Sequence, residues 1–230
     1  MNGMATAAGG DARHRDALLA AANTLGVTVD SAAAEQLLAY LAMLQQWNRV
    51  YNLTALRDPD EMLSHHLVDC LAVLPALVRH AAGRPLRILD VGSGGGLPGV
   101  VLAVLQPSWQ VSCVDTVSKK ASFVRQVAAE LGLSNLRALH ARVETLDPKA
   151  GRFDVITSRA FASLADFTAL TEPLLADDGV WMAMKGKLPL EEQAALPASL
   201  TVFHVEQLTV PGLDAQRCLV WLRPADRVQA

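Results

Sequence analysis

Five glycines lie between residues 92 and 99 of this 230-residue chain, in the segment DVGSGGGLPG. An apolar run, LRILDV at 86–91, precedes them, and a helical pattern follows from residue 97. Glycine permits positive φ angles and lets the backbone approach a bound molecule to contact distance. A strand, a glycine-rich loop and a helix in this order are typical of a cofactor site. We therefore expect a ligand at this loop rather than a purely structural turn.

The glycines match two classes of cofactor site. GGGLPG at 94–99 fits the dinucleotide pattern GxGxxG, and Asp115, after the second apolar run, could bind a ribose. Residues 90–96 instead fit the acidic-x-Gly-x-Gly-x-Gly loop of S-adenosylmethionine enzymes. This register begins directly after the strand and puts Pro98 in the first helical turn. Its Asp90 suits an ammonium and a sulfonium, whereas it would repel a pyrophosphate. The sequence therefore favours a methyl donor.

Seven short runs rich in Val, Ile and Leu predict the strands of one sheet: 86–91, 110–115, 135–140, 153–158, 179–185, 201–208 and 217–223. Amphipathic helices are expected among the first five runs, near 97–105, 118–131 and 162–175. This alternation predicts parallel pairing in an α/β, Rossmann-like methyltransferase sheet covered on both faces. Only PGLDAQ joins the last two runs, so we expect the last strand to be antiparallel, unlike an all-parallel dinucleotide-binding sheet.

Residues up to about 82 carry a helical pattern instead. Leucines recur at helical spacing after Asp30–Ser31, so a helix should start there. Asp58–Pro59 is typical of an N-cap and the first residue of a second helix. We expect three parts, which are a flexible tail over 1–15, an N-terminal helical subdomain over 16–82 and an S-adenosylmethionine-dependent methyltransferase domain over 83–225.

Composition restricts the partners of this chain. It is 51% hydrophobic and 19% charged, with a formal net charge of −3. No strongly basic block is present, so any RNA-binding surface must be a local patch. No continuous apolar run reaches ~18 residues, and we therefore expect no membrane segment.

The cysteines and histidines give no sign of a metal site. Cys70, Cys113 and Cys218 are isolated in apolar runs, as reduced core residues of a cytoplasmic protein would be. His65 and His66 are adjacent, so on a helix they point about 100° apart, and no carboxylate or cysteine completes a ligand set. We expect no bound metal.

Several motifs in combination resemble the RsmG (GidB) family of 16S ribosomal RNA guanine-N7 methyltransferases. They are WNRVYNLTALRDPDEMLSHHLVDCL, DVGSGGGLPG, ARVETL, ITSRAFASL and MKGK, and the similarity runs from about residue 35 to 224. The resemblance implies transfer of a methyl group from S-adenosylmethionine to N7 of one guanine, position 527 in conventional numbering. S-adenosylhomocysteine would be the product, and the modification would belong to rRNA processing in ribosome biogenesis.

The resemblance also implies cofactor contacts at Gly92, Leu97, Val143–Glu144 and Arg159, to which the loop pattern adds Gly94 and Asp115. Ser93 stands where the family often has Thr, a difference that should be harmless. For Glu144 an equally common interpretation is an acidic residue in the first turn of a helix.

Guanine N7 carries a lone pair and no proton, so its methylation needs no general base. Enzymes that methylate exocyclic amines usually have an (Asp/Asn)-Pro-Pro-aromatic loop after the fourth strand, where this chain has SRAF at 158–161. We therefore expect no catalytic base, and catalysis by positioning through Arg159 and Phe161. Arg159 could bind the cofactor, an RNA phosphate or guanine O6. Phe161 could stack on the flipped purine or fill the core.

Arg142, Lys185 and Arg217, with Lys187, are expected near strand ends and predict the local RNA-binding patch. The expected partner is 16S rRNA or a small-subunit particle, with no membrane and no obligate protein partner evident. Three alternatives stay open: a small-molecule methyltransferase of the same fold, a dinucleotide-binding oxidoreductase, and a non-catalytic RNA-binding scaffold that senses the cofactor.

Overall fold

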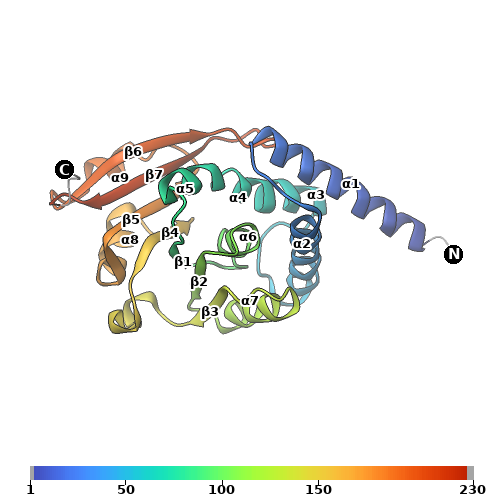
Figure 1. Ribbon diagram of the computed structural model, residues 1–230, viewed down its shortest axis with the longest axis horizontal. Helices are drawn as coiled ribbons and strands as arrows, with labels where there is room; N and C mark the ends of the chain where they lie inside the picture. The colour runs from blue at the N-terminus through green and yellow to red at the C-terminus, as the bar shows by residue number, and fades with distance from the viewer. Residues whose placement is uncertain (1–2, 227–230) are drawn as a thin grey trace.

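The computed structural model describes the backbone of residues 3–226 and the side chains of residues 12–226. Seven strands form one sheet in the order β3-β2-β1-β4-β5-β7-β6 (Figure 1). The strands are β1 Arg87–Val91, β2 Gln110–Asp115, β3 Leu136–His140, β4 Phe153–Arg159, β5 Leu175–Lys185, β6 Leu200–Leu208 and β7 Arg217–Pro224.

All seven predicted strands are present, and their pairing is as expected. The strands β3, β2, β1, β4 and β5 pair in parallel, whereas β7 is antiparallel to both β5 and β6. The main difference in bounds is in β5, which starts at Leu175 instead of residue 179, with an irregular register opposite Phe153–Val155. The α/β sheet with an antiparallel last strand is therefore confirmed.

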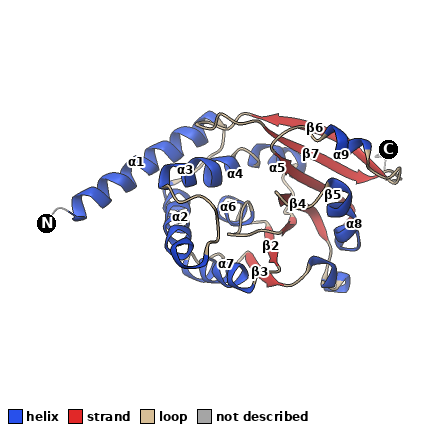
Figure 2. Cartoon of the chain, turned by 180° about the vertical axis from the view of Figure 1, so that it is seen from behind, coloured by secondary structure: helices blue, strands red, loops and turns tan. Residues whose placement is uncertain are grey.

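Helices cover both faces of the sheet (Figure 2). They are α1 Gly3–Thr24, α2 Ser31–Tyr51, α3 Pro59–Met62, α4 Asp69–Leu71, α5 Leu74–Ala81, α6 Gly99–Leu105, α7 Ser118–Glu130, α8 Leu164–Thr171 and α9 Leu190–Ala194, with a π-helical turn at Leu63–Val68 and 3₁₀ turns at Val143–Thr145, Pro148–Ala150 and Glu172–Leu174.

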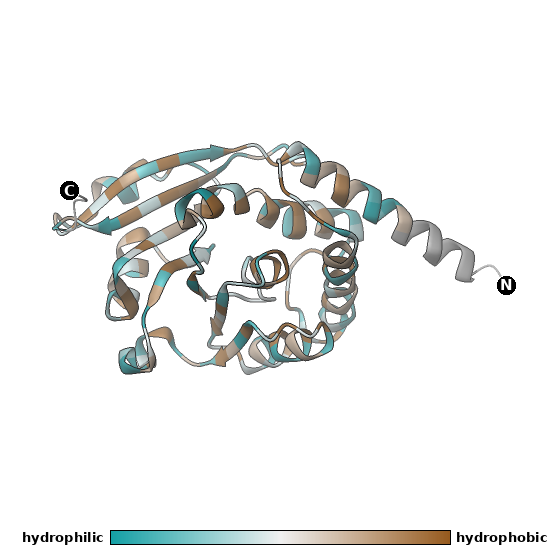
Figure 3. Cartoon of the chain, viewed as in Figure 1, coloured by the Kyte–Doolittle hydropathy of each residue, from teal (hydrophilic) through white to brown (hydrophobic). Residues whose placement is uncertain are grey.

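Alternate residues of each strand enter two different cores. Ile88 of β1 belongs to the core beneath α2, α5, α6 and α7, while its neighbour Leu89 belongs to the core beneath α8. Helix α6 is buried almost completely, and Figure 3 shows it in the hydrophobic colour over most of its length. A helix that is apolar on all sides is stable only where other elements of the protein bury it.

The N-terminal helices share the first of these cores with the sheet. Leu37 and Leu44 of α2 lie in the same buried cluster as Ile88 and Met182 of the sheet. The expected helix starts are present, because the side chain of Asp30 accepts the Ala33 N–H and caps α2. The N-terminal helices, here called the extension, therefore pack on the sheet and share its larger core.

Residues 3–15, where the sequence predicts a flexible tail, form the first part of α1. The segment is rich in alanine, which favours helix. Arg13 and His14 also contact Asp60 at the start of α3, at 2.8 and 2.7 Å. These exposed contacts connect α1 to the rest of the extension.

The second expected helix is broken into α3, the π-helical turn, α4 and α5. Pro59–Ala81 is long and apolar enough to cross a membrane by length and composition, but 72% of the apolar window is buried inside the protein. It is therefore a core segment. Its π-helical turn matters for the site, since such turns often occur where a helix carries functional residues. Here His66 and Asp69, in and just after the turn, are both buried.

Candidate functional site

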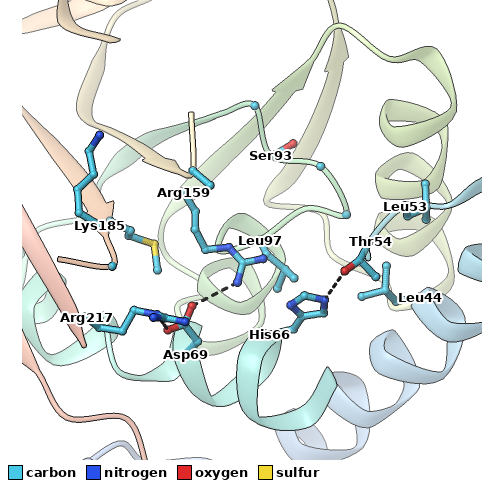
Figure 4. Close-up of a pocket in the computed structure, with 16 residues that line it drawn as sticks. Leu44, Leu53, Thr54, His66, Asp69, Ser93, Leu97, Arg159, Lys185 and Arg217 are labelled. Carbon is cyan, nitrogen blue, oxygen red and sulfur yellow. Dashed lines mark hydrogen bonds and ion pairs between the residues drawn. The ribbon is translucent and has the colours of Figure 1, made fainter. Parts of the chain in front are cut away.

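A cavity of about 430 Å³ opens at the carboxyl ends of the central strands, beside the glycine loop (Figure 4). Three segments form its wall: the glycine loop, the ends of β4, β5 and β7, and the helical extension. Its lining residues are Leu44, Leu53, Thr54, His66, Asp69, Gly92, Ser93, Gly94, Gly95, Leu97, Arg159, Ala160, Met184, Lys185, Gly186 and Arg217. This is the edge of an α/β sheet where ligands bind.

The glycine loop needs its glycines for two separate reasons. Gly92, Gly94 and Gly96 have φ angles of 65°, 58° and 88°, which side-chain-bearing residues rarely adopt. A Cβ at Gly92 would also lie 2.8 Å from Cδ2 of Phe161. No such obstacle stands at Gly94, where a Cβ would meet nothing within 4 Å. The loop therefore presents bare backbone towards open space at the cavity.

Two side chains from distant elements hold this loop in place. The Tyr40 hydroxyl of α2 donates a buried hydrogen bond of 2.8 Å to the carbonyl oxygen of Gly95. Asp115, at the end of β2, accepts the Gly94 N–H at 3.0 Å through Oδ2 and the Val117 N–H at 2.8 Å through Oδ1. The acid expected to bind a ribose thus also fixes the loop, and its carboxylate retains lone pairs for further donors.

Asp90 does not line the cavity, which corrects its expected place beside a cationic cofactor. It is fully buried below the loop, where Oδ2 accepts the N–H of Gly99 at 2.9 Å. Burial raises the pKa of Asp90 to about 7. Gly99 must stay small, because a Cβ there would collide with Sγ of Cys113. Asp90 is therefore a structural acid at the start of α6.

Asp69 forms the electrostatic centre of the cavity. Its side chain is 3% exposed and lies between two guanidinium groups. Oδ2 is 3.3 Å from Nη1 of Arg159, and Oδ1 accepts from Nε of Arg217 at 2.8 Å (Figure 4). Nη1 of Arg159 also donates to the carbonyl oxygen of His65. One buried carboxylate thus orients two arginines from different strands, leaving one net positive charge.

His66 lies beside this triad on the extension. Its Nε2 is 2.9 Å from the hydroxyl of Thr54. Burial, together with the nearby charge of Arg159, lowers the pKa of His66 to about 4, so the imidazole is neutral at neutral pH. Asn48 fixes the loop that carries Thr54, since its side-chain oxygen accepts the Thr54 N–H.

The structure separates the expected cofactor residues into two groups. Gly92, Gly94, Leu97 and Arg159 line the cavity, and Asp115 contacts the loop directly. Val143 is buried in the core beneath α8. Glu144 is paired at the surface with Arg142, at 2.8 Å from Nε. Neither Val143 nor Glu144 lines the cavity.

Phe161 packs on the core side of the glycine loop. Its ring meets Phe167 edge-on, with 6.2 Å between the centroids, and its Cδ2 lies 2.8 Å from where a Cβ of Gly92 would stand. This position supports the interpretation of Phe161 as a core residue beneath the loop.

The three expected RNA-binding cations each have an acidic partner. Lys185 and Arg217 line the cavity, where Nζ of Lys185 lies 2.8 Å from Oε2 of Glu192. Arg142 lies outside the cavity, in its exposed pair with Glu144. Lys187 is exposed beyond the end of β5. The structure therefore places two of these cations at the opening.

Sequence reasoning missed the contribution of the extension. Thr54, His66 and Asp69 line the cavity, although the sequence analysis assigned none of them to the site. One signal was present, because Asp69 stands alone in the apolar run LVDCLAV. A buried carboxylate requires a charged partner, so this residue could have been expected to meet a cation.

The cavity suits an elongated cofactor with both apolar and charged parts. Its volume falls within the range of roughly 300–1,000 Å³ typical of small-molecule sites. Bare loop backbone lies on one side, leucine side chains supply an apolar wall, and Arg159 offers a guanidinium that a carboxylate can pair with. These features fit S-adenosylmethionine, which has an apolar-faced nucleoside and an amino-acid end. Among the described residues no group of three or more His, Cys, Asp and Glu is placed to hold a metal ion.

Comparisons with known proteins agree on one family. A family model described as rRNA small subunit methyltransferase G matches residues 33–220. The ribosomal RNA small subunit methyltransferase G of Acidovorax sp. strain JS42 is 62% identical over 216 residues, covering 90% of this chain and 94% of the relative. The protein of the same name from Leptothrix cholodnii is 63% identical over 210 residues, covering 91% and 95%.

Solved structures share the fold at low sequence identity. The 1,6-didemethyltoxoflavin-N1-methyltransferase of Burkholderia thailandensis, solved with S-adenosylhomocysteine, has a TM-score of 0.54 at 19% identity and covers 81% of this chain and 89% of that one. TrmN from Thermus thermophilus has a TM-score of 0.52 at 24% identity, and the match spans 70% of this chain and 53% of that one. These similarities show the fold.

Replacing Asp69 by Asn should destabilise the protein strongly. The change leaves the guanidinium groups of Arg159 and Arg217, whose side chains are 24% and 23% exposed, side by side without their counter-charge. Removing one partner of a buried pair typically costs about 3–5 kcal/mol. Glu206→Gln is the matched control, because its partner Arg79 is 60% exposed and a surface pair contributes no more than about 1 kcal/mol. Urea unfolding measures both, and equal small losses would contradict the central role of Asp69.

Asp90 should make stability depend on pH. Its pKa is raised from 3.8 to about 7 on folding. The folded protein therefore binds this proton more tightly, and the resulting stabilisation is complete below about pH 4 and lost as the pH rises to about 7. Asp90→Asn has no carboxyl at this position and does not lose this stabilisation. The difference in unfolding free energy, variant minus wild type, should therefore increase between pH 5 and pH 8.

Urea unfolding at the two pH values checks this prediction. The titration of His66 occurs in both proteins and cancels in the difference. Asp214→Asn at an exposed position is the control, and its unfolding free energy should stay within about 0.5 kcal/mol of wild type. A constant offset between Asp90→Asn and wild type across this range would show that Asp90 is already ionised in the folded state.

Proposed function

The chain belongs to the rRNA small subunit methyltransferase G family, and on this premise we propose that it methylates N7 of one guanine of 16S rRNA, at position 527 in conventional numbering. Family membership makes it an S-adenosylmethionine-dependent methyltransferase of small-subunit rRNA. The identity of the atom is the finer part of the proposal. Naked 16S rRNA or a small-subunit particle is the proposed substrate, which places the enzyme in the cytoplasm.

The observation that carries this proposal is the chemistry of the cavity lining. It holds a single carboxylate among the described residues, Asp69, and both of its oxygens are engaged by arginines. The one lining imidazole, His66, is a weak base with a pKa of about 4. The site thus offers no free general base at neutral pH. This suits N7, whose in-plane lone pair attacks without losing a proton.

The cofactor contacts follow the sheet edge. We assign Gly92, Gly94 and Leu97 to hold the cofactor against bare backbone, and Arg159 to pair with its carboxylate. When bound, the cofactor supplies an electrophilic methyl group on a sulfonium. We assign Asp115, at the end of β2, to bind the ribose of the cofactor. The neighbouring strand β3 ends at His140, so Val143 and Glu144, which follow it, lie at the same edge of the sheet. We assign this segment to the adenine of the cofactor.

What the protein contributes is positioning. Arg159 is held by Asp69 and by the carbonyl oxygen of His65, so its guanidinium has a fixed direction before any substrate arrives. Fixed orientation of two reactants can account for about 7–11 kcal/mol of barrier lowering. Family membership argues against the small-molecule methyltransferase, the dinucleotide oxidoreductase and the non-catalytic scaffold as alternatives.

A methylation assay tests the proposal. Protein is incubated with tritiated S-adenosylmethionine and unmodified 16S rRNA, naked or in small-subunit particles, and the RNA is digested to nucleosides. Label should appear in 7-methylguanosine, and a transcript with adenine in place of guanine 527 should stay unlabelled. Label in another nucleoside, or equal label in the altered transcript, would refute the proposed atom or position.

Two arginines that flank β4 provide the matched variants. Arg159→Ala removes the guanidinium from the cavity and should abolish most of the labelling. Arg152→Ala removes one that precedes β4, at the opposite edge of the sheet, where it pairs with exposed Asp177. This second variant should label RNA like wild type.

A further inference from the structure

The cations expected to bind RNA are largely neutralised in this structure. Arg142 pairs with Glu144, Lys185 with Glu192, and Arg217 with Asp69. An RNA phosphate at any of these positions must compete with a carboxylate at about 2.8 Å. Since counterion release by unpaired Lys and Arg dominates RNA affinity, other cations are needed near the cavity.

Two cations without an acidic partner lie in the first turn of α7, where it meets the last turn of α2. They are Lys119 and Lys120, and no ion pair involves them in the described part of the chain. The two helices are in contact, because Trp47 of α2 packs on Phe123 of α7 at 5.4 Å between ring centroids. In Figure 1, α7 runs across below the lower end of α2. The result is a local positive surface on a chain of net charge −3.

An aromatic ring lies beside Lys119. The side chain of Tyr51 is 41% exposed at the end of α2, and the adjacent Val50 is 69% exposed. Nζ of Lys119 lies 4.9 Å from the centre of the Tyr51 ring, and Trp47 supports the ring at 5.1 Å. Exposed aromatic rings beside cations are what unpaired nucleobases stack on, since every base offers a π face.

This surface is continuous with the cavity. Leu53 and Thr54, which follow Tyr51 by two and three residues, both line the cavity. The backbone N–H of Val117, two residues before Lys119, donates to Oδ1 of the same Asp115 that accepts the N–H of Gly94. A strand that delivers a base into the cavity would therefore pass over Tyr51.

We propose that Tyr51, Lys119 and Lys120, here called the stacking surface, bind the single-stranded RNA next to the methylated guanine. Lys119 and Lys120 contact phosphates, and Tyr51 stacks on a neighbouring base. The proposal rests on the proposed function, because it assigns a docking site for that substrate. It extends the RNA-binding surface to the helical extension, opposite Lys185 and Arg217.

Charge reversal tests the phosphate contacts. The double variant Lys119→Glu/Lys120→Glu is compared with Lys149→Glu, an exposed lysine in the turn before β4, at the opposite edge of the sheet. Binding of a fluorescent, unmodified 16S rRNA fragment is measured by anisotropy over a salt series. The double variant should bind at least tenfold more weakly, and its slope of log K against log salt should fall by about 0.7 for each lost phosphate contact.

Tyr51→Ala and Tyr51→Phe separate stacking from the hydroxyl group. Phe keeps the ring and should bind like wild type, whereas Ala should weaken RNA binding severalfold without changing the salt slope. All variants are also titrated with S-adenosylhomocysteine by calorimetry, and its affinity should be unchanged. A loss of cofactor affinity that matches the loss of RNA affinity would assign these residues to the cofactor site and overturn the proposal.

Two other outcomes also overturn it. One is RNA affinity unchanged in the double variant and in Tyr51→Ala. The other is a change in log K for Lys149→Glu that is half as large as that of the double variant, because it reverses one charge where the double variant reverses two, and such a result would show that only net charge matters. Failure of the proposed function is distinguishable, because wild type would then leave 16S rRNA unlabelled while the stacking surface variants still lost RNA affinity.

Discussion

The site depends on a stretch of backbone without side chains that is held rigidly from several directions. Tyr40 binds the carbonyl oxygen of Gly95, Asp115 binds the N–H of Gly94, and Asp90 binds the N–H of Gly99. Glycine is otherwise the most flexible residue, so such a loop without these contacts would lose its shape. One of the three contacts comes from the helical extension, so the extension helps to fix the shape of the loop.

A second feature is the near-complete pairing of charge around the cavity. Asp69 joins Arg159 to Arg217, and Glu192 occupies Lys185. Pairing with a carboxylate fixes the orientation of each cation. It also lowers the attraction of that cation for other anions, including RNA phosphates. The stacking surface has the opposite character, with unpaired cations and an exposed ring. The cations on one side of the opening are thus held in fixed orientations by carboxylates. The proposed stacking surface on the other side has unpaired cations that suit a flexible RNA strand.

Local patterns predicted the strands, the glycine loop and the antiparallel end of the sheet, because these depend on residues adjacent in the chain. The contacts of Asp69 with Arg159 and Arg217 could not be predicted, since they join positions 90 and 148 residues apart. The loop pattern and the charge of Asp90 predict this residue beside the cofactor, which is wrong. Its strand neighbours alternate between two cores, and its own side chain faces the buried start of α6. The contacts of Arg13 and His14 with Asp60 could not be predicted for the same reason, since they join positions 47 and 46 residues apart.

The central claim is that the fixed glycine loop cradles a sulfonium nucleoside. Isothermal titration calorimetry of the purified protein with S-adenosylmethionine, S-adenosylhomocysteine and NADH tests it most directly. We predict saturable heat with one bound molecule per chain for the first two ligands and none for NADH. Saturable binding of NADH with no heat from either sulfur nucleoside would contradict the account.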